Sequence, residues 1–152
     1  MYVKEIEYED YNGEKIKENF YFNLTETELL KAELATPGGL TDKMLRIVNS
    51  RDVPKMAEFF DWIIRKSYGE ISEDKKRFIK SDEISKAFTE TEAYNKLFTE
   101  FFNDTTGKAL SDFINGIVPK DLAAKMNTPE AQAELEKRGI SVANINARNN
   151  NT

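Results

Sequence analysis

Neither cysteine nor histidine occurs among the 152 residues of this chain, so it must bury a hydrophobic core that is stable without cross-links. Disulfide bonds are excluded, and so are structural zinc and iron–sulfur sites, which depend on these two ligand types. Imidazole acid–base catalysis and thiol chemistry are excluded as well. A hydrophobic content of 39%, with 10 Phe and 6 Tyr, is enough to build a core. The residue types therefore favour a scaffold or binding protein.

The net charge of −5 is concentrated at the front of the chain. Residues 1–35 contain nine acidic residues and four lysines, whereas the remainder carries 18 residues of each sign. A nucleic-acid-binding protein normally shows a basic stripe, and the basic run around Phe78 is offset by nearby acids, so we expect no nucleic acid partner. Because there is no membrane-length apolar run and no secretory signal, we expect a cytoplasmic protein that makes no contact with a membrane.

The N-terminal residues predict a β-hairpin over about residues 2–23. Asp10-Tyr11-Asn12-Gly13 suits a type I turn whose glycine adopts the left-handed conformation and forms a bulge. This register pairs Glu7 with Lys17 on one face and collects the apolar side chains on the other. A two-residue turn would instead place Glu7 opposite Glu18 and divide the apolar side chains between both faces. We therefore expect the bulged register.

Three helices are predicted after the hairpin. The first begins with the capping box Thr25-Glu26-Thr27-Glu28 and ends at Pro37-Gly38-Gly39. A shorter second helix covers residues 42–49. Asp52 caps the third helix, and Gly69 ends it. Apolar residues cover well over half of the circumference of this third helix, so we expect it to lie centrally in the fold.

The second half of the chain predicts a loop followed by further helices. Residues 70–80 are polar and loop-like. Ser81 begins a short helix, and a second capping box at Thr89-Glu90-Thr91-Glu92 opens a longer one. Asp104 is expected to cap the helix after that, which continues up to Pro119.

These elements predict an α+β fold that is predominantly α-helical, with the N-terminal β-hairpin packed on a helical bundle. Two more short helices are expected at 120–126 and 129–138. We expect one globular domain over residues 1–139, with its helices at about 25–138. Residues 140–152 have few apolar side chains to bury and are predicted to form a flexible C-terminal tail.

The helix over residues 89–103 contains the strongest candidate for a partner-binding surface. Its apolar residues span about half of its circumference, and Phe98 and Phe102 lie at one edge of this stripe. One interpretation places both rings in the core. The other leaves them partly exposed to bind a partner, since aromatic side chains are enriched at interfaces. Trp62, at one edge of the third helix, has the same two interpretations.

No segment predicts catalysis, a cofactor or a metal. Thr106-Gly107-Lys108 resembles a phosphate-binding loop, but the required upstream glycine and the hydroxyl residue after the lysine are both missing. The turn at residues 10–13 lacks the spacing and distal glutamate of a calcium loop. No pair of the 27 acidic residues has the spacing and apolar surroundings of a catalytic carboxylate pair. We therefore expect that the protein is not an enzyme.

Four segments, in their order and spacing, resemble a known protein family. They are FYFNLTETEL (20–29), KSYGEISEDKKRFIKS (66–81), FTETEAYNKLF (88–98) and FINGIVPKDL (113–122). Together they resemble the tail assembly chaperones of long-tailed, siphovirus-type bacteriophages of Gram-positive hosts. The resemblance covers about four-fifths of the chain. It departs from the family near Lys75, where relatives often have a glycine, and this difference concerns the shape of the polar loop.

The resemblance implies a protein without catalytic activity that acts in the host cell cytoplasm. The resemblance implies that it binds the long, helical tape measure protein, or another phage tail protein, and that it keeps the tape measure protein soluble until tail-tube subunits assemble around it. The resemblance carries over no site residues. The acidic front of the chain suggests steering of a basic client, and homo-oligomers are possible.

Two other functions remain open on the sequence alone. One is a structural virion protein, either a minor tail component or a head–tail connector component. The other is a hydrolase or nuclease that uses carboxylates and a divalent metal.

Overall fold

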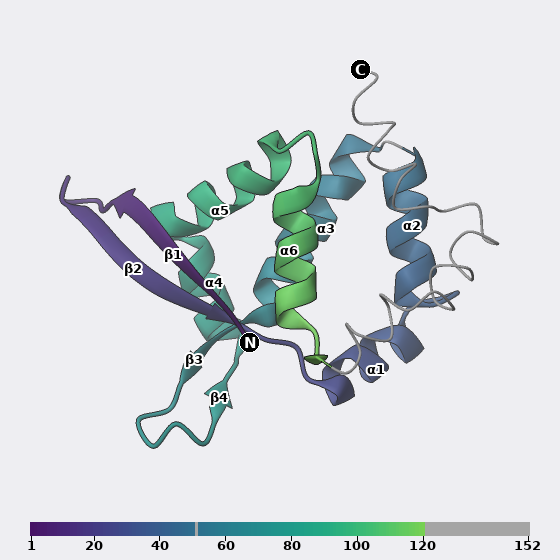
Figure 1. Ribbon diagram of the computed structural model, residues 1–152, viewed down its shortest axis with the longest axis horizontal. Coiled ribbons are helices and arrows are strands. Elements are labelled where there is room, and N and C mark those ends of the chain that lie inside the picture. The colour runs from purple at the N-terminus through teal and green to yellow at the C-terminus, as the bar shows by residue number, and fades with distance from the viewer. Residues whose placement is uncertain (51, 121–152) are drawn as a thin grey trace.

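The computed structural model describes residues 1–50 and 52–120, and its longest strands form the predicted hairpin (Figure 1). Strands β1 (Tyr2–Glu9) and β2 (Lys15–Phe22) are antiparallel, and Glu7 lies opposite Lys17 as predicted. The carboxylate of Asp10 accepts hydrogen bonds from the backbone N–H groups of Asn12 and Glu14, both at 2.9 Å. Gly13 has φ +81°, the left-handed conformation that the bulge requires. The bulged register is therefore confirmed.

Two short strands extend this hairpin into a four-stranded sheet of order β1-β2-β3-β4. Strands β3 (Tyr68–Ile71) and β4 (Phe78–Ile79) fall in the segment predicted as a polar loop over residues 70–80, so that prediction is wrong. Tertiary pairing accounts for the difference, because β3 pairs with the end of β2. A Cβ atom on Gly69 would lie 2.7 Å from Phe78 Cε1, so glycine permits the close approach of β4.

The turn between β3 and β4 holds Lys75 in a backbone conformation that favours glycine. Its φ is +62°, the left-handed region, where a side chain costs about 1 kcal/mol or more. We expect Lys75→Gly to raise the unfolding free energy by about 0.5 kcal/mol, after the entropic cost of glycine in the unfolded chain. The neighbouring variant Lys76→Gly should lower it; urea unfolding that ranks the two variants in the opposite order would contradict this reading.

The next helices are α1 (Glu26–Ala35), α2 (Leu40–Ser50) and α3 (Val53–Ser67). The capping box at the start of α1 is confirmed, with Thr25 and Glu28 each bonding the other's backbone N–H. Asp52 caps α3 as predicted by accepting from Lys55 N at 3.2 Å. Helix α3 ends at Ser67, before Gly69, because the chain enters β3 at Tyr68. Its position among α2, α4 and α5 confirms that it is central.

The last described helices are α4 (Asp82–Thr89), α5 (Glu92–Asn103) and α6 (Lys108–Ile117). Ser81 caps α4 as predicted. The second predicted capping box is wrong: Thr91 caps α5 by accepting from Tyr94 N, and Thr89 is the last residue of α4.

Asp104 was predicted to be the N-cap of α6, but it lies before the N-cap residue and bonds to the start of the helix from there. The N-cap of α6 is Gly107, which has no side chain to offer. The carboxylate of Asp104 accepts from Thr106 N at 3.0 Å and from Ala109 N at 2.7 Å. It thereby satisfies a backbone donor in the first turn of the helix.

The core lies between one face of the sheet and the helices, which Figure 1 shows gathered on one side of the hairpin. The predicted α+β class is confirmed. Within the described residues, no helix has both the length and the apolar character needed to cross a bilayer. The helices predicted at 120–126 and 129–138 and the tail predicted at 140–152 lie outside the described residues. The core residues are Ile6, Phe20, Phe22, Leu24, Phe60, Ile63, Ile64, Phe88, Ala93, Leu97, Phe101, Phe113, Ile117 and Val118.

Helix α1 has no fully buried residue, and an ion pair helps to attach it to the rest of the fold. Lys80 Nζ donates to both carboxylate oxygens of Glu28, at 2.7 and 2.9 Å, and also to the carbonyl oxygen of Asn23. Burial lowers the pKa of Lys80, and the hydrogen bonds with Glu28 only partly oppose this. Burial favours a higher pKa for Glu28, but the hydrogen bonds from Lys80 and Thr25 outweigh it and the pKa is lowered.

Replacing Lys80 with methionine should lower the unfolding free energy at neutral pH by about 1–2 kcal/mol, because Glu28 keeps its charge and loses its partner.

The lowered pKa of Glu28 means that the stability contributed by this carboxylate is present above the ordinary pKa of 4.5 and is lost as the pH falls through the folded-state pKa. Glu28→Gln should therefore remove part of the acid sensitivity of stability. Urea unfolding at several pH values measures both effects, and equal acid sensitivity in Glu28→Gln and the wild type would contradict the second.

Candidate partner-binding surfaces

Helix α5 places Phe98 and Phe102 side by side at the edge of its buried stripe. Ala93, Leu97 and Phe101 are buried, whereas Phe98 is half-buried and Phe102 is 46% exposed. The rings of Phe98 and Phe102 stack with their centroids 6.1 Å apart and an interplanar angle of 12°. Partial exposure, one of the two interpretations that the sequence left open, is what the structure shows for both rings, and both also pack on the core residue Phe60.

Trp62 lines a different surface, a groove between α1, α2 and α3 to which neither Phe98 nor Phe102 contributes. Its ring stacks on Phe59 at 6.1 Å. Phe60 lies between the two surfaces: it is buried, and its ring meets Phe59 at 6.5 Å and Phe98 at 6.2 Å. The structure thus brings Phe98 and Phe102 together and places Trp62 apart from them.

This groove combines apolar and basic side chains, and we call it the basic groove. Its volume is about 1010 Å³. It contains five basic side chains and one acidic side chain, Glu58. Lys55 pairs with Asp52 at 3.9 Å; in the described part of the chain the other four basic residues form no ion pair within 4 Å. The groove is lined by Lys31, Ala32, Ala35, Thr36, Pro37, Leu40, Lys43, Arg46, Ile47, Ser50, Lys55, Glu58, Phe59, Trp62 and Lys66.

Sequence reasoning identified only Trp62 among the residues of the basic groove. A local signal exists on α3, where Lys55, Phe59, Trp62 and Lys66 recur at helical spacing and set two aromatic residues between two lysines. The contribution of α1 and α2 has no such signal, because it depends on how the three helices pack. The balanced charge of residues 36–152 also hides a local excess of basic residues.

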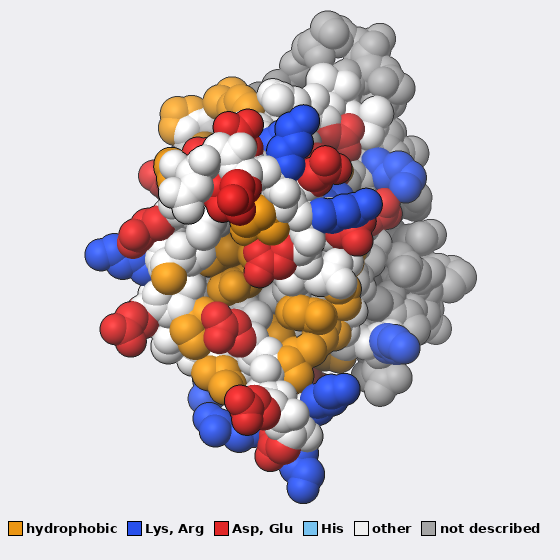
Figure 2. Space-filling view, turned by 90° about the vertical axis from the view of Figure 1, so that its left-hand side faces the viewer, with side chains coloured by type: hydrophobic (Ala, Val, Ile, Leu, Met, Phe, Trp, Pro, Cys, Tyr) orange, Lys and Arg blue, Asp and Glu red, His pale blue; other side chains and the backbone are white. Residues whose placement is uncertain are grey.

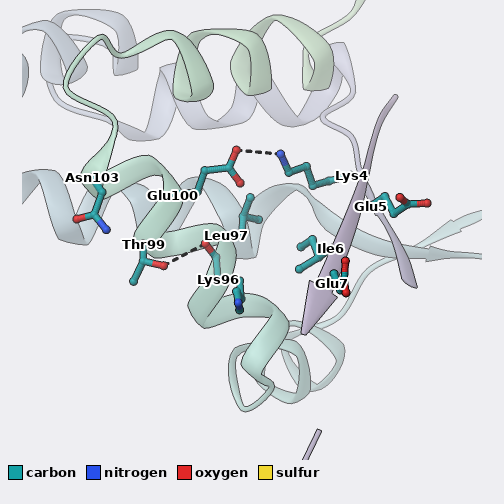
Figure 3. A pocket seen from close by; sticks show the side chains of 9 residues that line it. All are labelled: Lys4, Glu5, Ile6, Glu7, Lys96, Leu97, Thr99, Glu100 and Asn103. Atoms are coloured by element: carbon teal, nitrogen blue, oxygen red, sulfur yellow. Dashed lines mark hydrogen bonds and ion pairs between the residues drawn. The ribbon is translucent and has the colours of Figure 1, made fainter. Parts of the chain in front are cut away.

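A second, shallower pocket of about 390 Å³ lies between β1 and α5 (Figure 3). Lys4 and Glu100 point toward each other there and form an ion pair at 2.9 Å. Ile6 and Leu97, behind them, are buried core residues. This ion pair attaches the edge strand β1 to helix α5. We therefore interpret the pocket as part of the packing between these two elements.

The face shown in Figure 2 carries hydrophobic side chains in several separate patches, with acidic side chains between them. Such a surface stays well solvated and still offers several small apolar contact points.

Hydrogen bonding and burial raise the pKa of Tyr8 and of Tyr94, so both side chains stay protonated. Burial, followed by the hydrogen bond to Asp61, raises the pKa of Tyr94. The hydrogen bond to Glu18 and burial raise the pKa of Tyr8 to about 12. These contacts join neighbouring elements of the fold.

Among the described residues, no group of three or more acidic side chains lies close enough together to hold a metal ion.

Comparison with known protein families identifies the family of the chain. Residues 1–151 match the model of a protein family described as phage tail assembly chaperone. No curated protein matches, and no solved structure matches. The family match covers nearly the whole chain, and the family is not an enzyme family. The chain therefore belongs to a family of phage tail assembly chaperones.

Proposed function

We propose that this protein binds the tape measure protein of a long-tailed, siphovirus-type phage of a Gram-positive host and keeps it soluble during tail assembly. It acts in the host cell cytoplasm, before tail-tube subunits surround the client. The observation that carries the proposal is the match to the chaperone family over residues 1–151.

The surface chemistry supports this proposal. An elongated helical client needs weak, repeated apolar contacts with a carrier that remains soluble. The stacked pair Phe98–Phe102 and the basic groove each offer exposed apolar side chains. Charged residues make up 32% of the chain and keep the rest of the surface hydrated.

Co-expression with the tape measure protein of the same phage tests the proposal. We expect the tape measure protein to be insoluble alone and to co-elute with the chaperone when both are present. The control is co-expression with an unrelated soluble protein of equal size. A client that stays insoluble beside the chaperone would count against the proposal.

Mass spectrometry of purified virions distinguishes this function from that of a minor tail or connector component. A chaperone is absent from the finished particle or present far below the tail proteins, whereas a structural component stays at stoichiometric amounts. Finding the protein at stoichiometric amounts would favour the structural role.

A further inference from the structure

We propose that the basic groove binds an amphipathic helix of the client in which a stripe of apolar side chains is flanked by Asp and Glu. The proposal rests on the proposed function only for the identity of the client. The chemistry of the bound segment is inferred from the side chains of the groove.

The apolar side chains of the groove can receive one face of a helix. Trp62 and Phe59 stack on each other and remain half-exposed, while Ile47 from α2 is buried beside the opening. Ala32, Ala35 and Leu40 add apolar surface from α1 and the start of α2. A groove between helices is a recurrent binding site for an amphipathic helix, whose residues at spacings of three and four insert together.

The charges that line the groove determine which residues can flank the apolar stripe of the bound helix. Five basic side chains and one acidic side chain line the groove, although the whole chain has a net charge of −5. All five basic residues are exposed, so their charged ends can reach a partner. Acidic residues beside the bound stripe would pair with them, and basic residues there would be repelled.

The other conspicuous basic segment lacks this combination. Lys75, Lys76 and Arg77 lie in the exposed turn between β3 and β4, next to Glu73 and Asp74. Their charges are partly balanced by these acids. The basic groove, by contrast, combines the half-exposed rings of Phe59 and Trp62 with four basic residues that form no ion pair within the described ranges 1–50 and 52–120.

The single tryptophan of the chain makes the groove directly observable, because Trp62 is one of its lining residues. The probe is a synthetic helical peptide of 20 residues with leucine at spacings of three and four and glutamate at the flanking positions. We expect a blue shift of Trp62 emission on titration into the full-length protein, with an affinity that falls as salt is raised from about 0.05 to about 0.5 M. A peptide with lysine in place of glutamate should produce no shift.

Charge reversal locates the binding. Lys31→Glu with Lys43→Glu changes two exposed residues on α1 and α2 and should weaken binding of the glutamate peptide at least about 10-fold, a loss of about 1.4 kcal/mol. Lys76→Glu with Lys86→Glu makes the same change in charge elsewhere and should leave the affinity unchanged. Unaltered thermal unfolding of each double variant confirms that it is folded.

Several outcomes would overturn the inference. Equal binding of the two peptides, or equal effects of the two double variants, would show that the groove does not select acidic helices. A shift of Trp62 emission with protein concentration alone would assign the groove to a second copy of the chain. Absence of peptide binding to the full-length protein would show that the groove does not take up such a helix.

The tape measure complex separates this inference from the proposed function. If the complex forms and Lys31→Glu with Lys43→Glu leaves it intact, the groove inference fails and the chaperone function stands. If the glutamate peptide binds but the tape measure protein does not, the groove inference stands and the identity of the client is wrong.

Discussion

The Phe22→Ala variant is expected to lose about 3–5 kcal/mol of unfolding free energy, because it opens a large cavity at the centre of the core. Phe22 is fully buried. Its ring meets that of Phe113 on α6 at 5.2 Å, that of Tyr68 on β3 at 5.7 Å and that of Phe88 on α4 at 5.9 Å. One side chain therefore connects the end of β2 to three elements that are distant in sequence.

This loss is a substantial fraction of the total stability of a domain, which is about 5–15 kcal/mol. The melting temperature should fall by about 10–20 °C. The matched control is Tyr21→Ala, which removes the neighbouring aromatic residue from the opposite face of β2. Tyr21 is half-buried and should cost about 1 kcal/mol. Urea unfolding of both variants makes the comparison, and similar losses would contradict the central role of Phe22.

The hairpin illustrates what the sequence could predict. Its register depends on local information: Asp10 and Gly13 define the turn, and the pairing of Glu7 with Lys17 distinguishes it from the alternative. The helix starts at Thr25, Asp52 and Ser81 were predictable for the same reason, because an N-cap side chain bonds to a backbone N–H within three residues.

Strands β3 and β4 illustrate what the sequence could not predict. They contain four and two residues, and Gly69 lies inside β3, so neither has a local strand pattern. They form because β2 offers a pairing edge to Tyr68 and Gly69. The segment Thr89-Glu90-Thr91-Glu92 contains two candidate N-caps of the same type. The choice of Thr91 follows from the length of α4, which extends through the buried Phe88 to Thr89.

The two candidate surfaces also differ in how much of each could be predicted from the sequence. The edge position of Phe98 and Phe102 follows from the helical period of one segment, but the sequence left open whether the two rings would be buried or partly exposed, because that depends on the packing of α5 against its neighbours. The basic groove joins side chains from three helices, and no single segment contains enough of them to reveal it.

The Phe102→Ser variant is expected to weaken binding of the tape measure protein about 10-fold, while the melting temperature changes by only a few degrees. Phe102 is 46% exposed, so nearly half of its surface is available to a partner, while the rest already packs within the protein, including against Phe60 at 6.5 Å. An elongated client that contacts both this ring and the basic groove loses affinity when either surface is altered. Co-elution of the tape measure protein with each variant, together with thermal unfolding, measures the two effects separately.

Adding Phe98→Ser should abolish binding but also destabilise the free protein, because the ring of Phe98 packs on Phe60 at 6.2 Å and on Tyr94 at 6.0 Å. Phe102→Ser is therefore the decisive variant. Its control is Ile71→Ser, which removes an apolar side chain of similar exposure, 39%, from β3. Normal binding by Ile71→Ser and weak binding by Phe102→Ser would assign the α5 edge to the client. A strongly lowered melting temperature for Phe102→Ser would instead show that this ring serves the core.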